Sequence, residues 1–368
     1  MAVGILYQDG LREYDFGEGH PFQGVRYGLF YNYLKKHILE DDNYRIIKAD
    51  PVTDKDLLLI CHKNYVEFTR GYYESASFGI SYPGRFNEFQ SPDNLPAGKI
   101  GNPEQAARIV VGQAKLACQL IQENKYKKVF SIGGGLHHAR WNYGEGFCLY
   151  NDVAYCGKYL LEEYKLDRIL ILDIDAHAGN GTYGYFQEEP RVLFIDLHQD
   201  PRGIYPGSGY ASEIGSGKGT GFSINIPMPI NAGYDSYKLA FESIVEPVVE
   251  EYQPQIIIRN GGSDPHFEDS LTNLGLTVEG FRMISEKTRT MAEICNGKVI
   301  DLIVSGYNMN VLPNCWLALV AGLSGFNVQV DEPVLVPENL KTDHALDYTK
   351  QYIEEVIQYH KDYWKCFR

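Results

Sequence analysis

Short apolar runs alternate along this chain with amphipathic stretches of helical length, and this alternation constrains the fold more than any other feature. Strands buried in a parallel sheet are continuous apolar runs, and helices between them return the chain. The sequence therefore predicts an α/β fold in a single domain over 1–368, with a mostly parallel central sheet of about eight strands flanked by helices. The runs expected to form strands are 4–8, 44–49, 57–61, 128–133, 168–175, 192–198, 222–227, 255–260 and 299–304.

Helices are indicated by apolar stripes of helical period and by capping residues. The clearest helix runs over 103–123, where Asn102 can cap the first turn. The other expected helices are 235–252, 277–296 and 343–364. Pro247 is expected to kink or break the helix that contains it. The long stretches 76–100 and 199–221 carry no such pattern, and we predict that they are loops beside a binding site.

Composition narrows the class of protein. A formal net charge of −14 argues against direct binding of nucleic acid, because the phosphate backbone requires a basic surface. No apolar run approaches the ~18 residues of a membrane span, and the first residues show no signal-peptide pattern. The seven cysteines are scattered without a Cys-x-x-Cys pair, as reduced thiols of a cytosolic protein are. The expected location is therefore cytoplasmic, and the oligomeric state stays open.

Residues 168–181 join a buried strand to metal-binding residue types. Asp173, Asp175 and His177 fall two residues apart, so that all three would share one face if the strand continued. Two carboxylates and an imidazole at the carboxyl end of a parallel strand favour a metal site. Taken alone, the stretch fits equally well an ordinary polar strand end with His177 hydrogen-bonded in a loop.

Three further strands are followed by reactive side chains. These are His137 and His138 after 128–133, Asp264 after 255–260, and Tyr307 after 299–304. Asp264 completes an Asp-His-Asp set with Asp175 and His177, and such a set leaves room for water and substrate, as catalytic zinc sites do. Tyr307 stands where a phenol could donate a hydrogen bond to a developing oxyanion.

Five motifs in order carry a resemblance to a known family. They are Gly-Gly-x-His-His-Ala (134–139), Gly-Glu-Gly-Phe-Cys-x-x-Asn-Asp (144–152), Asp-x-Asp-x-His-x-Gly-Asn-Gly (173–181), Gly-x-Asp (262–264) and Gly-Tyr-Asn (306–308). With an opening motif at 19–22 and Arg26, they resemble the histone deacetylase family, which includes the acetoin-utilisation and acetylpolyamine amidohydrolase proteins. The resemblance extends to about residue 325 and implies the arginase–deacetylase fold.

The resemblance also implies two cation sites. Asp175, His177 and Asp264 would bind the catalytic metal, usually zinc, with ferrous iron (Fe²⁺) as the alternative for oxygen and nitrogen ligands. A structural potassium ion would bind near a set of residues on neighbouring strands. This set is Asp173, Asp175, His177, Asp196 and Leu197.

Catalytic roles follow from the same resemblance. His138 would be the general base, which takes a proton from water and returns it to the leaving amine. His137 would be its electrostatic partner, oriented by Asp173. Asn180 would support His138 as a neutral imidazole, as in the class II branch of the family. Tyr307 would polarise the scissile carbonyl.

A set of substrate-binding residues is implied as well. These are Asp93, Gly146, Phe147, Tyr205 and Leu271. Phe147 and Tyr205 would form the aromatic walls of an acyl-lysine tunnel, and Asp93 would be a rim carboxylate that holds the substrate backbone. Leu271 stands where polyamine-specific members carry a glutamate, which counts against a dedicated polyamine enzyme.

The favoured function is removal of acetyl or related acyl groups from acyl-lysine or a similar amine. The alternatives are a deacetylase of small acetylated amines and a weakly active acyl-lysine-binding protein. A binuclear manganese ureohydrolase is rejected, because it needs another carboxylate where this chain has Gly179. Ser305 replaces the first glycine of the usual Gly-Gly-Tyr, which leaves the acyl-chain preference open, and Ala178 replaces a frequent second histidine.

Overall fold

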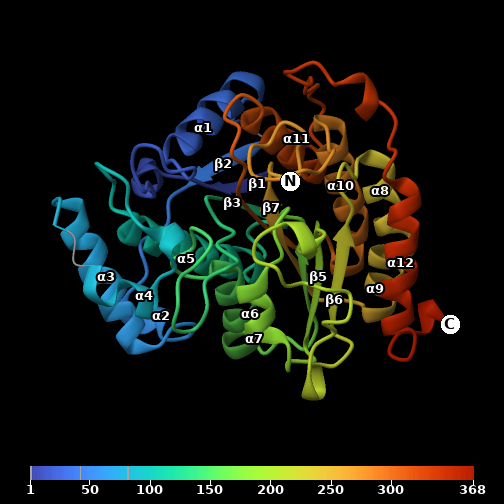
Figure 1. Ribbon diagram of the computed structural model, residues 1–368, viewed down its shortest axis with the longest axis horizontal. Helices are drawn as coiled ribbons and strands as arrows, with labels where there is room; N and C mark the ends of the chain where they lie inside the picture. The colour runs from blue at the N-terminus through green and yellow to red at the C-terminus, as the bar shows by residue number, and fades with distance from the viewer. Residues whose placement is uncertain (1, 42, 81–82) are drawn as a thin grey trace.

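An eight-stranded sheet forms the centre of the molecule in the computed structural model, which describes residues 2–41, 43–80 and 83–368 (Figure 1). Every strand pairing in it is parallel. The strands are β1 (Val3–Leu6), β2 (Tyr44–Ile47), β3 (Lys128–Ile132), β4 (Ile169–Asp173), β5 (Val192–Gln199), β6 (Ser223–Met228), β7 (Ile256–Gly262) and β8 (Val299–Ser305). The α/β fold with a parallel central sheet is therefore confirmed.

Sequence order and spatial order differ in the middle of the sheet. The strands lie in the order β2-β1-β3-β8-β7-β4-β5-β6, so the last two strands of the chain insert between β3 and β4. Because all the strands are parallel, their carboxyl ends meet at one edge of the sheet. The five adjacent strands β3, β8, β7, β4 and β5 thus bring their following residues together there.

Helices cover both faces of the sheet. They are α1 (Val25–His37), α2 (Asp54–Leu57), α3 (Lys63–Ser77), α4 (Phe86–Phe89), α5 (Pro103–Gln122), α6 (Asp152–Glu163), α7 (Asn180–Phe186), α8 (Tyr234–Ala240), α9 (Glu246–Tyr252), α10 (Val278–Met291), α11 (Leu312–Ser324) and α12 (Leu346–His360). Helices α5, α6 and α7 lie on one face, and α1, α11, α10, α8 and α12 lie on the other (Figure 1). Among the described residues, no helix is both long and apolar enough to cross a membrane.

The expected strand at 57–61 is wrong. Thr53 accepts a hydrogen bond from the backbone N–H of Asp56, whose carboxylate accepts one from Thr53 in return, so the segment starts as the capped helix α2. Leu57, Ile60 and Cys61 are buried, whereas Leu58 is exposed. This burial follows helical spacing, which a short apolar run cannot distinguish from a strand.

The break expected at Pro247 is present. The predicted helix 235–252 is interrupted by a π-helical turn over Phe241–Val245, and α9 starts at Glu246 with Pro247 in its first turn. A proline has no N–H for the usual helical bond, and a wider turn accommodates that loss. The predicted loop 76–100 contains the short helix α4 and two 3₁₀ turns, while its residues 81–82 lie outside the described part of the chain.

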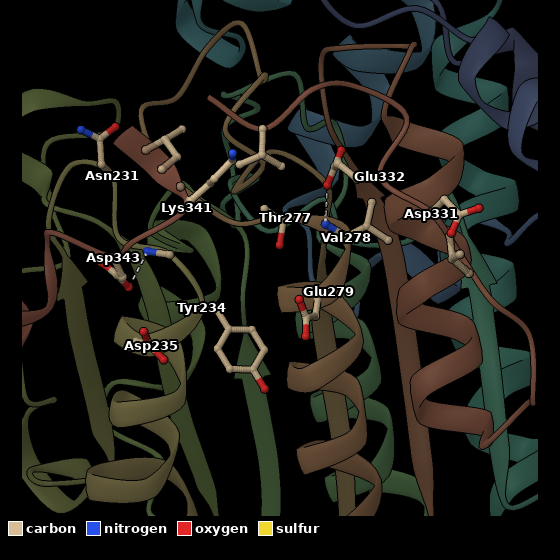
Figure 2. Close-up of a pocket in the computed structure, with 15 residues that line it drawn as sticks. Asn231, Tyr234, Asp235, Thr277, Val278, Glu279, Asp331, Glu332, Lys341 and Asp343 are labelled. Carbon is tan, nitrogen blue, oxygen red and sulfur yellow. Dashed lines mark hydrogen bonds between the residues drawn. The ribbon is translucent and has the colours of Figure 1, made fainter. Parts of the chain in front are cut away.

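Hydrogen bonds join the segment after α11 to the N-termini of two helices. The Asp343 carboxylate accepts hydrogen bonds from the backbone N–H groups of Gly233 and Ser236 at the start of α8, and Glu332 accepts one from Val278 at the start of α10 (Figure 2). Carboxylates suit helix N-termini, where the backbone N–H groups are unpaired. A cavity of about 510 Å³ lies between these two helix ends. It contains none of the residues predicted to form the functional site.

A buried ion pair joins the two inserted strands. Arg259 on β7 donates from Nε and Nη2 to the two carboxylate oxygens of Asp301 on β8, at 2.8 and 2.6 Å. Both side chains are about 1% exposed. We expect Asp301→Ala to lower the free energy of unfolding by about 3–5 kcal/mol, because it leaves the guanidinium buried and unpaired. Chemical denaturation measures the change.

The control for this prediction removes both charges. The double variant Arg259→Met with Asp301→Leu should recover most of the stability, since apolar side chains of similar volume can replace a buried ion pair. Equal losses in the single and double variants would show that packing, rather than the unpaired charge, controls stability at this position.

Candidate metal centre and active site

Strand β4 ends at Asp173, two residues earlier than predicted. Asp175 and His177 therefore lie in the loop after the strand and not on its face. Local hydrogen bonds position them: the backbone N–H of Asp175 donates to Asp173 Oδ1 (3.1 Å), and that of His177 donates to Asp175 Oδ1 (2.8 Å). Asp175 and His177 do lie close together, but the continued strand that was expected to align them on one face is wrong.

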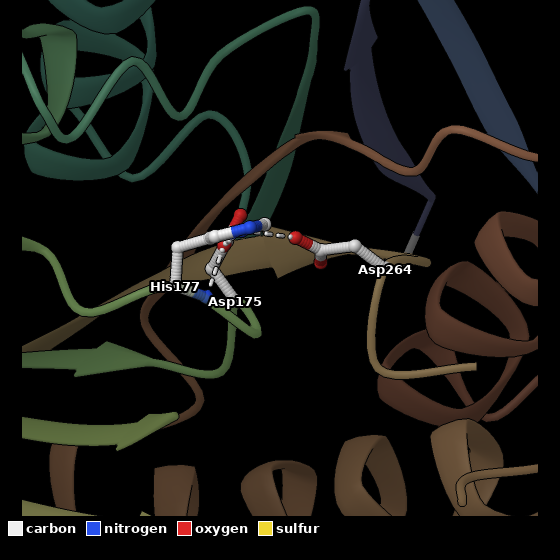
Figure 3. Close-up of side chains that lie close together, drawn as sticks. All are labelled: Asp175, His177 and Asp264. Carbon is white, nitrogen blue, oxygen red and sulfur yellow. Dashed lines mark hydrogen bonds and ion pairs between the residues drawn. The ribbon is translucent and has the colours of Figure 1, made fainter. Parts of the chain in front are cut away.

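Asp175, His177 and Asp264 form a compact buried set (Figure 3). Their potential ligand atoms all lie within 4.8 Å of one another. His177 Nδ1 lies 3.2 Å from Asp175 Oδ1 and 3.0 Å from Asp264 Oδ2. Asp264 reaches this position from the end of β7, next to β4 in the sheet.

The charge of this set fits a divalent metal ion. Two carboxylates buried from water require a compensating positive charge. Burial alone would lower the pKa of His177, but hydrogen bonds with Asp175 and Asp264 raise it to about 10, which reflects the negative potential of the two carboxylates. Imidazole nitrogen and carboxylate oxygen are both zinc ligands, and three protein ligands leave a position for water or substrate, as in catalytic zinc sites.

His137 and His138 lie next to this set, after the glycine turn that follows β3. His137 Nδ1 is 2.9 Å from Asp173 Oδ2, and the Nε2 atoms of the two histidines are 3.0 Å apart. Two ring nitrogens at that distance must share a proton. Burial opposes charge on His137, but Asp173 and Asp175 raise its pKa to about 9. Burial and the neighbouring His137 lower the pKa of His138 well below its usual value, so His137 holds the shared proton.

An interaction that the sequence analysis missed orients Asn180. Asn180 Oδ1 lies 2.7 Å from His138 Nδ1, and Asn180 Nδ2 donates to Glu145 Oε1 at 3.0 Å. Glu145 also accepts a hydrogen bond from Arg140. Because an ionised carboxylate can only accept, the amide must turn its NH₂ group toward Glu145 and its oxygen toward His138. Nδ1 of His138 therefore carries hydrogen, and Nε2 is the acceptor nitrogen of this ring, where it meets the proton held by His137.

Tyr307 faces the same site from the end of β8. Its ring centre lies 6.5 Å from that of His177 and 5.8 Å from that of Phe147. Burial raises the pKa of Tyr307 well above its usual value, so its hydroxyl stays protonated and can donate. Its backbone N–H donates to Asp269 Oδ2 (2.7 Å), whose other oxygen accepts from the N–H of Leu271 (2.9 Å).

Two more positioning side chains were not found from the sequence. Asn260 on β7 donates from Nδ2 to both carboxylate oxygens of Asp173, each at 2.9 Å. Asp269 ties the Tyr307 backbone to the loop that carries Leu271. Asn260 is the last residue of the predicted strand 255–260, but an amide at a strand end has no sequence signature of its own.

A strained turn presents Phe147. Gly146 and Phe147 both have positive φ angles, +59° and +63°, which are uncommon for a residue with a side chain. A Cβ on Gly146 would lie 2.3 Å from the His138 ring, so only glycine fits there. The Phe147 carbonyl accepts from Tyr14 (2.7 Å), and the Gly146 N–H donates to Asp93 Oδ2 (2.9 Å). Asp93 thus lies beside the predicted tunnel wall.

The remaining predicted residues lie around the same centre. The Tyr205 ring centre is 5.0 Å from that of His138 and 6.5 Å from that of His177. Asp196 pairs with Asp173 across β4 and β5, and Leu197 follows it in the buried strand. The Asp196 carboxylate accepts from the backbone N–H of Gly179 (2.8 Å) and lies 2.8 Å from His198 Nδ1. The potassium site stays a prediction.

The fold and the buried Asp-His-Asp set define an α/β protein with a candidate metal centre at the carboxyl edge of a parallel sheet. The chain belongs to the histone deacetylase family: the model of the histone deacetylase domain matches residues 20–323. This confirms the resemblance found in the motifs.

Relatives of the whole chain are known. A protein of Archaeoglobus fulgidus named probable deacetylase is 34% identical over 375 residues and is covered in full, as is this chain. The acetoin utilization protein AcuC of Staphylococcus aureus is 32% identical, with 89% of this chain and 82% of AcuC covered. The crystal structure of the HDA15 HD domain matches with a TM-score of 0.82 at 23% identity, over 100% of this chain and 97% of that one. That likeness supports the fold.

Proposed function

We propose that this protein is a metal-dependent amidohydrolase that removes acetyl or related acyl groups from acylated lysine side chains. The observation that carries the proposal is the buried Asp175, His177 and Asp264 set beside two histidines that share one proton. The family and the relative named probable deacetylase support the same reaction.

Asp175, His177 and Asp264 would hold zinc, with ferrous iron as the alternative. A divalent ion bound there polarises the acyl carbonyl and lowers the pKa of water. His138 Nε2 is the general base: in the reaction its lone pair exchanges the His137 N–H for the attacking water, accepts a proton from that water and then donates it to the leaving amine. His137 stabilises these two proton transfers through the proton that it shares with His138.

The remaining groups act on the substrate. The Tyr307 hydroxyl donates a hydrogen bond to the oxyanion that develops from the acyl carbonyl. Phe147 and Tyr205 form the walls that enclose the acyl-lysine side chain, and Asp93 accepts a hydrogen bond from the substrate backbone. Leu271 at the rim offers no charge to a polyamine, which favours a lysine substrate over a small acetylated amine. Potassium would bind at the pair of strands that carries Asp173 and Asp196.

The test is turnover of the zinc-loaded protein on a matched panel. The panel contains peptides with acetyl-, longer acyl- and trifluoroacetyl-lysine, together with N-acetylputrescine. We expect release of the acyl group from the lysine peptides with higher kcat/KM than from N-acetylputrescine. A preference for N-acetylputrescine would favour the small-amine alternative. Absence of turnover on the whole panel, with one metal bound per chain, would favour a binding protein.

Glu145 offers a finer test of the mechanism. We expect Glu145→Ala to lower kcat about tenfold with little change in KM, because the Asn180 amide is then free to turn and His138 can adopt the wrong tautomer. Steady-state kinetics on the best peptide measures this split. Arg140→Ala removes only the outer partner of Glu145 and is the matched control. Equal effects of both variants, or a change in KM alone, would contradict the orienting role.

A further inference from the structure

Ser305 is placed against the metal centre by an irregularity in the sheet. The pairing of β7 with β8 shifts by one residue between Gly261 and Gly262, so that Gly262 lies opposite Ser305. Such a bulge re-aims the side chains beside it. Gly262 is also required by space, because a Cβ there would lie 2.3 Å from Ser305 Oγ.

The bulge directs the Ser305 hydroxyl to a predicted metal ligand. Ser305 Oγ donates to Asp264 Oδ1 at 2.6 Å, a bond between two buried side chains. The backbone N–H of Ala176 also donates to Asp264 Oδ1, at 3.3 Å. The other oxygen, Oδ2, faces His177 Nδ1 at 3.0 Å. The two oxygens of the Asp264 carboxylate therefore have different partners: Oδ1 accepts hydrogen bonds, and Oδ2 faces His177.

We propose that Ser305 is a positioning residue of the metal centre, whose hydroxyl holds Asp264 so that only Oδ2 is presented to a divalent ion. This proposal rests on the proposed function insofar as Asp264 binds that ion. The glycine that the family resemblance leads us to expect at this position has no side chain and cannot make the bond. The expected effect of the Ser305 contact is on metal affinity rather than on acyl-chain preference.

The physical reason is pre-organisation. Without the hydroxyl, the Asp264 carboxylate can rotate about its last bond and loses a charge-assisted hydrogen bond, which is among the stronger kinds. Groups that orient metal ligands in this way typically change metal affinity by about 10–100-fold when they are removed. We expect Ser305→Ala and Ser305→Gly to weaken zinc binding by about 10–100-fold.

The experiment measures metal affinity in the absence of substrate. Zinc is competed between the full chain and a chromogenic chelator, and a Co²⁺-loaded sample gives a second readout through its visible absorption spectrum. Ser263→Ala is the matched control: its hydroxyl is equally buried but contacts the Ser305 carbonyl (3.3 Å).

Each outcome decides the proposal. Weaker zinc binding in Ser305→Ala, with Ser263→Ala within twofold of wild type, supports it. Wild-type affinity in Ser305→Ala, equal losses in both alanine variants, or a wild type that binds no zinc would overturn it. If Ser305→Ala fails to fold, Ser305→Gly provides the decision by the same comparison. Tight zinc binding without turnover on the substrate panel would refute the proposed function and leave the role of Ser305 intact.

Discussion

His138→Ala is expected to lower kcat on an acetyl-lysine peptide by about 10²–10⁴-fold, the usual contribution of a general base. His138 Nε2 is the acceptor nitrogen of its ring, since Nδ1 carries hydrogen toward Asn180 and the proton between the two histidines belongs to His137. Removing the ring leaves water without an acceptor and the leaving amine without a donor. Steady-state kinetics of zinc-loaded variants measures the loss.

Metal content separates this effect from damage to the centre. His138 does not belong to the Asp175, His177 and Asp264 set, so His138→Ala should bind zinc with the same stoichiometry as wild type. His137→Ala should also reduce kcat, because it removes the partner of the shared proton. A His138→Ala variant that keeps kcat within a few-fold of wild type would contradict the assignment of the base.

Tyr307→Phe is expected to lower kcat by about 10²–10³-fold, as removal of one oxyanion donor does. The substitution deletes a single oxygen and keeps the ring that packs against Phe147 and His177. KM should change little, because the hydrogen bond strengthens only as the carbonyl gains negative charge. Single-turnover kinetics on the best peptide of the panel measures the chemical step directly.

The matched control is Tyr348→Phe, an exposed tyrosine that is 61% accessible and lies on α12, a helix that carries no residue of the proposed site. It should keep wild-type kcat and KM. The raised pKa of Tyr307, caused by its burial, also predicts that activity does not fall through ionisation of this phenol near pH 10. A Tyr307→Phe variant with higher KM and unchanged kcat would instead assign the hydroxyl to substrate binding.

Secondary structure was predicted correctly where a segment has a local sequence pattern. It was predicted wrongly where tertiary packing determines the structure. The helix α5 begins at Pro103 after the predicted cap Asn102, whose side chain accepts from the N–H of Gln105. The expected strand 57–61 failed because one-sided burial of a short apolar run is visible only in three dimensions. Asp175 and His177 were selected for their chemistry, while the assumed strand geometry was wrong.

Residue types and their order along the chain determined the α/β class, the family and the chemistry of the strand ends, because these depend on local patterns that survive without a fold. Tertiary structure alone decided how those ends combine. Insertion of β7 and β8 between β3 and β4 brings Asp264 to His177. A one-residue shift in the pairing of β7 with β8 directs the Ser305 side chain to Asp264. Such contacts depend on strand register across more than 40 residues of sequence, which no local pattern encodes.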